Sequence, residues 1–144
     1  AKLLAESEKN DSALCSIYNG MGLYASNIHR DYYSALHYFF EGIEATHRCQ
    51  YQELEAILLG NISSIYYLKD DPTGLTYSLQ IYELGHQLNS AYLIFIGALN
   101  ASYMYYLLHE YDKALPYIQE AEFIMKALNK SNKNKPLVEK AKKK

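Results

Sequence analysis

The residues that most often carry out chemistry are too scattered in this chain to form a recognisable site. His29, His37, His47, His86 and His109 contain no His-Glu-x-x-His pair of the kind that binds zinc on one helix face. The two cysteines, Cys15 and Cys49, match neither a metal nor a redox spacing. His47 and Arg48 stand directly before Cys49, but at a predicted helix end, where cations favour the helix dipole. We therefore expect no catalytic residue and no metal site.

Two further segments resemble ligand loops only in part. Lys69-Asp70-Asp71-Pro72-Thr73-Gly74 is acidic like a calcium loop, but it lacks the alternating oxygen ligands and the closing Glu. Gly20-Met21-Gly22 follows no predicted strand and has no third Gly, so it does not predict a nucleotide-binding loop. The sequence thus favours a protein that is not an enzyme and needs no cofactor.

Charge is distributed unevenly along the chain. Residues 1–129 carry 7 Lys and Arg against 15 Asp and Glu, a balance of 7 − 15 = −8. Residues 130–144 carry 7 Lys and one Glu, a balance of 7 − 1 = +6. Since the acidic part would repel phosphates, we expect no nucleic-acid binding by residues 1–129. The basic tail reads as a linker or as the start of a further helix at Pro136.

A short sequence pattern occurs three times at a nearly constant interval. It begins at Ala35, at Gly74 and at Ala114, offsets of 74 − 35 = 39 and 114 − 74 = 40 residues. The triplets that begin at Asn61 and Asn100 are also 100 − 61 = 39 residues apart. A period of this length is typical of stacked repeats, in which no unit buries its apolar face without a neighbour.

Apolar residues recur every three or four positions, which predicts an all-α chain of antiparallel helix pairs. The chain also opens with residues 1–9, which read as the end of a preceding helix that stops at Asn10, Asp11 and Ser12. Ala91–Leu108 is uncharged, but its polar and tyrosine side chains argue against a membrane span. The predicted helices cover residues 12–28, 32–48, 52–68, 72–88, 91–108 and 111–128.

Small and aromatic residues at fixed places in each unit resemble the tetratricopeptide repeat family over residues 12–128. The motif residues are Gly22, Ala35, Leu36, Tyr38 and Phe39 in the first unit, Tyr66, Leu75 and Tyr77 in the second, and Tyr105, Ala114, Leu115, Tyr117 and Ala121 in the third. The resemblance implies a right-handed α–α superhelix of about three hairpins. Its units would be about 12–50, 51–90 and 91–129, followed by the tail 130–144.

The repeat is longer than the usual unit of about 34 residues. Elongated units of this kind resemble the sensor regions of bacterial signalling and regulatory proteins. The resemblance therefore implies one segment of a larger regulatory protein, and we expect a cytoplasmic location for this segment.

In such repeats the first helix of each pair lines the concave surface, which implies a peptide-binding groove. An Asn amide both donates and accepts, so it can pair with a peptide unit, and Tyr adds stacking area. No Lys or Arg falls at the predicted groove positions, so we expect an uncharged groove. The implied groove residues are Asn19, Ser26, Asn61, Ser64, Tyr67, Asn100, Tyr103 and Tyr106.

The leading hypothesis is thus a non-catalytic module that binds a peptide or protein partner. The alternative is a structural spacer or a dimerisation module, in which Asn61 and Asn100 hydrogen-bond neighbouring helices. A homodimer is compatible with either hypothesis.

Overall fold

The computed structural model describes the backbone of residues 2–142 and the side chains of residues 7 and 9–132. Within residues 2–142 there is no strand, so the predicted all-α class is confirmed. A short 3-10 turn, η1 (Pro72–Gly74), precedes the fourth helix. The helices are α1 (Lys2–Asn27), α2 (Tyr32–Cys49), α3 (Gln52–Leu68), α4 (Leu75–Gln87), α5 (Ala91–Leu107) and α6 (Tyr111–Lys142).

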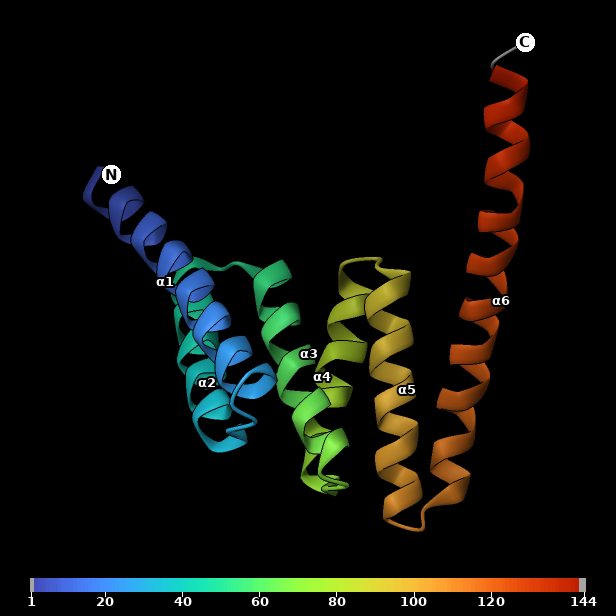
Figure 1. Cartoon of the computed structure of the whole chain (residues 1–144), viewed down its shortest axis with the longest axis horizontal. Coiled ribbons are helices and arrows are strands. Elements are labelled where there is room, and N and C mark those ends of the chain that lie inside the picture. The colour runs from blue at the N-terminus through green and yellow to red at the C-terminus, as the bar shows by residue number, and fades with distance from the viewer. Residues whose placement is uncertain (1, 143–144) are drawn as a thin grey trace.

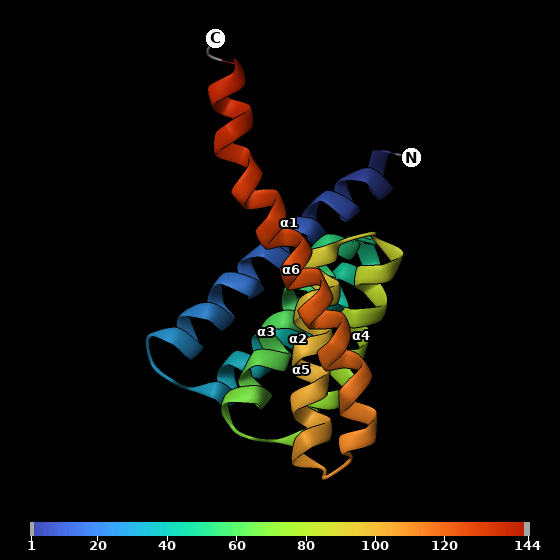
Figure 2. The same ribbon diagram turned by 90° about the vertical axis from the view of Figure 1, so that its right-hand side faces the viewer.

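The helices form a single row in chain order, from α1 at one end to α6 at the other (Figure 1). Each helix packs against the next, and α3 also contacts both α1 and α5. Figure 2 looks along this row from the α6 end, and in both views the N-terminus of α1 and the C-terminus of α6 extend beyond the body on the same side. The odd-numbered helices therefore form a connected series of neighbours.

The connections between the helices repeat one backbone geometry. Each contains one non-glycine residue with positive φ, namely Arg30, Gln50, Asp70, Asn89 and His109, with φ from 51° to 60°. After α3, α4 and α5 the next N–H then donates to the carbonyl five residues back, as from Asp71 to Tyr66 at 2.9 Å. This is the hydrogen bond of a Schellman motif, which ends a helix and reverses the chain.

These turns recur with the period seen in the sequence. Arg30, Asp70 and His109 are separated by 70 − 30 = 40 and 109 − 70 = 39 residues, and Gln50 and Asn89 by 89 − 50 = 39. The backbone of the connections therefore repeats in step with the sequence pattern.

Helix starts are fixed by side-chain caps. Asp31 accepts a hydrogen bond from the Ser34 N–H at 3.1 Å at the start of α2, and Ser90 accepts one from the Leu93 N–H at 3.3 Å at the start of α5. Asp71 accepts one from the Thr73 N–H at 2.9 Å directly before Pro72. The cap and first-turn proline predicted there are confirmed, although the first turn is 3-10 rather than α.

The core lies between consecutive helices, where small residues admit large neighbours. Gly22 of α1 lies beneath the ring of Phe39, because a Cβ there would come within 2.6 Å of Phe39 Cδ1. Gly42 of α2 faces Leu58 of α3 in the same way. Phe39 and Leu58 are almost completely buried, so these positions join α1, α2 and α3 into one core.

The two terminal helices are longer than the sequence predicted. The predicted stop at Asn10, Asp11 and Ser12 is wrong, since α1 continues unbroken from Lys2 to Asn27. Asp11 bonds Arg48 of α2 at 3.0 Å, so its side chain makes a tertiary contact instead of capping a helix. At the other end, α6 continues through the predicted boundary at 129/130 and through Pro136.

The α4–α5 crossing gives a test of this packing. A Cβ at Gly97 would lie 2.5 Å from the backbone nitrogen of Tyr82, whereas a Cβ at Gly60 of α3 would meet nothing within 4 Å. Gly97→Ala should therefore lower the free energy of unfolding by about 1–3 kcal/mol through overpacking. Gly60→Ala should leave it unchanged or raise it by up to about 1 kcal/mol, because alanine favours a helix. Chemical denaturation measures both, and equal effects would contradict the assigned close approach.

Candidate functional site

The predicted groove residues all lie on the three odd-numbered helices. Asn19 and Ser26 belong to α1, whereas the others belong to α3 and α5. Because α3 contacts both α1 and α5, these helices can share one surface. Within that surface the residues separate into a polar cavity, a buried network and an aromatic cluster.

The polar cavity lies between α1 and α3. Asn61 Nδ2 donates to Asn19 Oδ1 at 2.8 Å, which links the two helices beside a cavity of about 230 Å³. Three predicted residues line it: Ser26, Asn61 and Ser64. The rest of the lining is Leu23, Asn27, Arg30, Tyr32, Phe39, Ile65 and Leu68.

The polar groups of the cavity retain capacity for a ligand. The Ser26 and Ser64 hydroxyls donate to the carbonyls of Leu23 and Gly60 within their own helices, at 3.3 and 2.8 Å. Their oxygens can still accept, and Asn61 uses only one amide hydrogen in its bond to Asn19. The cavity can therefore both donate to and accept from a peptide backbone.

Arg30 is a cavity residue that the sequence reasoning missed. It lies in the connection after α1, at the positive-φ position, and its side chain lines the same cavity as Asn61. The prediction of an uncharged groove therefore fails at this point. The analysis of helical repeat positions could not find Arg30, although its period with Asp70 and His109 was readable in the sequence.

Asn100 belongs to the interior instead of an open groove. Its side chain is buried, and its Nδ2 donates to Ser63 Oγ at 3.0 Å. Ser63 Oγ lies 2.9 Å from Ser78 Oγ, and the Ser78 hydroxyl donates to the Gly74 carbonyl at 2.9 Å. Since Ser78 gives its hydrogen to Gly74, Ser63 must be the donor to Ser78. One directed chain of hydrogen bonds thus connects α5, α3 and the start of α4.

The remaining predicted residues form an aromatic cluster on α3 and α5. The ring of Tyr103 lies 4.5 Å from that of Tyr67 and 6.3 Å from that of Tyr106, centroid to centroid. Tyr67 and Tyr106 are 41% and 56% exposed, so a ligand can reach both rings. The Tyr103 hydroxyl donates to Asp70 Oδ1 at 2.5 Å, and this hydrogen bond raises the pKa of Tyr103 to about 12.

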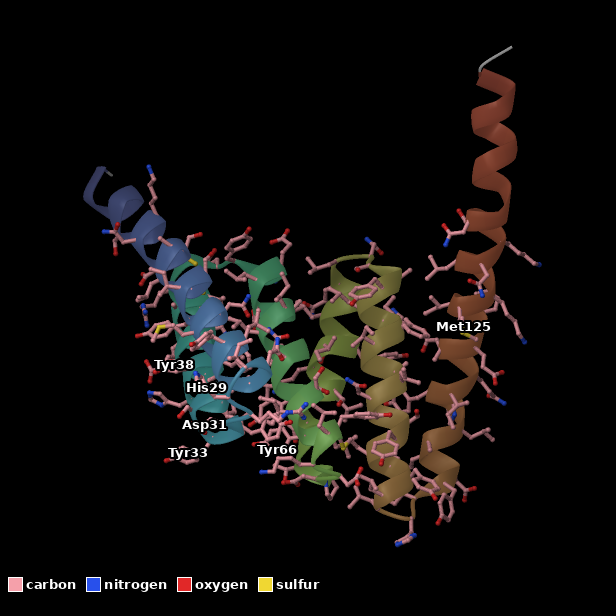
Figure 3. The ribbon with its side chains drawn as sticks, in the orientation of Figure 1. His29, Asp31, Tyr33, Tyr38, Tyr66 and Met125 are labelled. Carbon is pink, nitrogen blue, oxygen red and sulfur yellow. The ribbon has the colours of Figure 1, made fainter. Side chains whose placement is uncertain are left out.

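A larger cavity, of about 560 Å³, lies on the outer side of α1 and α2. The sequence reasoning did not identify it. Three of its residues, His29, Asp31 and Tyr38, are labelled in Figure 3 at the α1–α2 end of the row. The Ser34 hydroxyl lowers the pKa of Asp31, which is held as an ionised helix cap. The lining is Ser16, Ile17, Gly20, Met21, Tyr24, Ala25, His29, Asp31, Ser34 and Tyr38.

Cys15 has the environment of a structural cysteine. It is completely buried, and its Sγ–H donates to the Gly42 carbonyl at 2.9 Å. Burial raises its pKa to about 11, so the thiol stays protonated at neutral pH. A protonated and inaccessible thiol is a poor nucleophile.

Wider comparisons bear on the site as follows. Within the described part of the chain, no group of three or more His, Cys, Asp or Glu side chains is arranged to hold a metal ion. Among the described helices, none combines the length and the apolar character needed to cross a membrane. Comparison of the chain with protein-family models, with curated proteins and with solved structures gives no match.

Asn100 and Ser64 distinguish interior from surface roles. Asn100→Ala should lower the free energy of unfolding by about 1–3 kcal/mol, because the buried Ser63 hydroxyl loses its donor. Ser64→Ala should change it by less than about 0.5 kcal/mol, since Ser64 is exposed and bonds only its own helix. Thermal and urea denaturation compare them, and a neutral Asn100→Ala would contradict the buried network.

The Tyr103–Asp70 hydrogen bond predicts a dependence on alkaline pH. Because the pKa of Tyr103 is raised to about 12, its contribution to stability is complete below the ordinary tyrosine value and is lost as the pH rises towards 12. Asp70→Asn removes the charged acceptor and should lower the pKa of Tyr103. Ultraviolet titration of the phenols should then reveal one tyrosine that ionises earlier than in the unmodified chain. Asp112→Asn, at the start of α6, is the control and should leave the titration unchanged.

Proposed function

We propose that this chain is a non-catalytic tetratricopeptide-like module that binds an extended peptide or a partner helix along α1, α3 and α5. The helix pairs would stack as a right-handed superhelix of about three hairpins, with the odd-numbered helices on its concave side. The repeated turn geometry and the α1–α3 and α3–α5 contacts support this arrangement.

The observation that carries the proposal is the α1–α3 cavity. Ser26, Asn61 and Ser64 come from two helices distant in sequence, yet they line one hollow. An extended peptide could place a backbone amide against Asn61 and continue over the exposed rings of Tyr67 and Tyr106. Arg30 adds a positive charge, which favours a peptide with an acidic group near that point.

The resemblance to elongated repeats places this activity in regulation. A peptide-binding module of this kind would serve as the sensor or interaction segment of a larger bacterial signalling protein. Binding would need no cofactor, because recognition uses only hydrogen bonds, stacking and one guanidinium group.

The rival function is a structural spacer or a dimerisation module, and one observation favours it. The buried chain from Asn100 to Gly74 consumes polar groups for internal cohesion instead of offering them to a ligand. We therefore leave Asn100 out of the proposed contact set. The proposed contacts are Asn19, Ser26, Asn61, Ser64, Tyr67, Tyr103 and Tyr106, with Arg30 added.

Selection from a random peptide display library tests the proposal. Peptides enriched on the unmodified chain should bind Asn61→Ala about tenfold or more weakly, because a hydrogen-bonding partner in the cavity is lost. The control is Tyr33→Ala, which changes an exposed side chain on α2 and should bind the same peptides unchanged. Calorimetry of the selected peptides measures both variants. No enrichment, or equal binding by Asn61→Ala, would favour the structural role.

A further inference from the structure

The repeat register locates an unusual surface on α1. Positions that are buried in α3 and α5 have exposed apolar counterparts in α1. Ile17, Met21 and Tyr24 are 56%, 41% and 59% exposed, although they correspond to Leu58, Ile62 and Ile65, which are 0%, 0% and 3% exposed. The shift is constant, at 58 − 17 = 62 − 21 = 65 − 24 = 41 residues. In α5 the same positions, Gly97, Ala101 and Met104, are also buried.

The reason for the difference is the preceding helix. Leu58 faces Gly42 of α2, and Gly97 meets Tyr82 of α4, so α3 and α5 are each covered by the second helix of the previous pair. No such helix covers α1 in the described chain, and its face forms the cavity of about 560 Å³.

The opposite end of the row carries the matching surface. On α6, Ile118 and Met125 are 42% and 45% exposed. Their counterparts in α2, Phe39 and Thr46, are each 1% exposed and lie 118 − 39 = 125 − 46 = 79 residues earlier. Their counterparts in α4, Ser78 and Gly85, are buried as well. The face of α6 that would cover a following helix is thus left apolar and open.

We propose that these two faces bind each other, so that α6 of one copy of this chain packs on α1 of the next. The face on α1 lacks a helix of the α2 and α4 type, and α6 is that type of helix. The face on α6 lacks a helix of the α3 and α5 type, and α1 supplies it. A second copy therefore satisfies both faces through the contact already used twice within the chain, at α2–α3 and at α4–α5.

The long ends of the terminal helices fit the same arrangement. Since the C-terminal end of α2 adjoins the N-terminal end of α3, the C-terminal part of α6 would lie beside the N-terminal part of α1. Both parts extend beyond the body on the same side in Figures 1 and 2. Residues 130–142 carry five Lys and one Glu, a balance of 5 − 1 = +4. Residues 2–12 carry two Lys and three acids, a balance of 2 − 3 = −1, so the charges are complementary.

This contact is heterologous, because it joins two different faces. Each copy keeps one free α1 face or one free α6 face, so assembly leads to open stacks or a ring instead of a closed two-fold dimer. The surface is separate from the α1–α3 cavity proposed for peptide binding, and it does not depend on that function.

Sedimentation velocity of the 144-residue chain tests the proposal with two variants. Met21→Lys blocks the α1 face and Met125→Lys blocks the α6 face, each by placing an ammonium group in the contact. The unmodified chain should form species larger than a monomer as its concentration rises. Each variant alone should associate at least about 100-fold more weakly. An equimolar mixture should form a 1:1 dimer, because each variant keeps the face that the other has lost.

Phe123→Lys is the matched control on α6. Phe123 is 74% exposed, but its counterparts Glu44 and Glu83 are exposed too, so it lies outside the contact. This variant should assemble like the unmodified chain. Circular dichroism of every variant checks that the helices are retained.

Three results would overturn the proposal. They are a chain that stays monomeric at all concentrations, self-association by either blocked variant alone, and a mixture that contains only monomers. Peptide binding by Met21→Lys separates the two proposals, since it should be unaffected if the cavity between α1 and α3 is the binding site.

Discussion

The close contact between the second helix of one pair and the first helix of the next is the constraint on which this structure depends. It is tightest between α4 and α5. There, Cβ atoms at Gly85 and Gly97 would come within 2.7 and 2.5 Å of the facing backbones at Ile94 and Tyr82. Side chains of any size would separate the helices, so glycine at both positions sets the distance between the pairs. That distance fixes where α5 lies relative to α3.

The position of α5 in turn determines the environment of the polar residues. Ser63 and Asn100 are buried together between α3 and α5, where unpaired polar groups would be costly. They are satisfied by the directed chain that ends at the Gly74 carbonyl. Asn61, on the same helix as Ser63, instead lies at the α1–α3 cavity and bonds Asn19. The same contact geometry therefore yields an internal network at one interface and an accessible site at the other.

The two surfaces proposed for binding differ in their chemistry. The α1–α3 cavity combines an amide, two hydroxyls and a guanidinium group, which suits recognition of a peptide backbone. The end faces on α1 and α6 are apolar and repeat an internal helix–helix contact, which suits another helix of the same type. Their separation along the row allows a ligand and a neighbouring copy to be bound at the same time.

The sequence by itself determined the class of structure, the period and most helix boundaries. Apolar spacing and local caps depend only on neighbouring residues, and so α3 was predicted at its observed bounds and Asp71 as a cap. The tertiary structure decided the rest. Asn61 and Asn100 begin the same triplet, yet one lines a cavity and the other is buried, because burial depends on the helices that lie next to each. For the same reason Asp11 bonds Arg48 inside α1 instead of ending a helix, and Arg30 reaches the cavity from a connection.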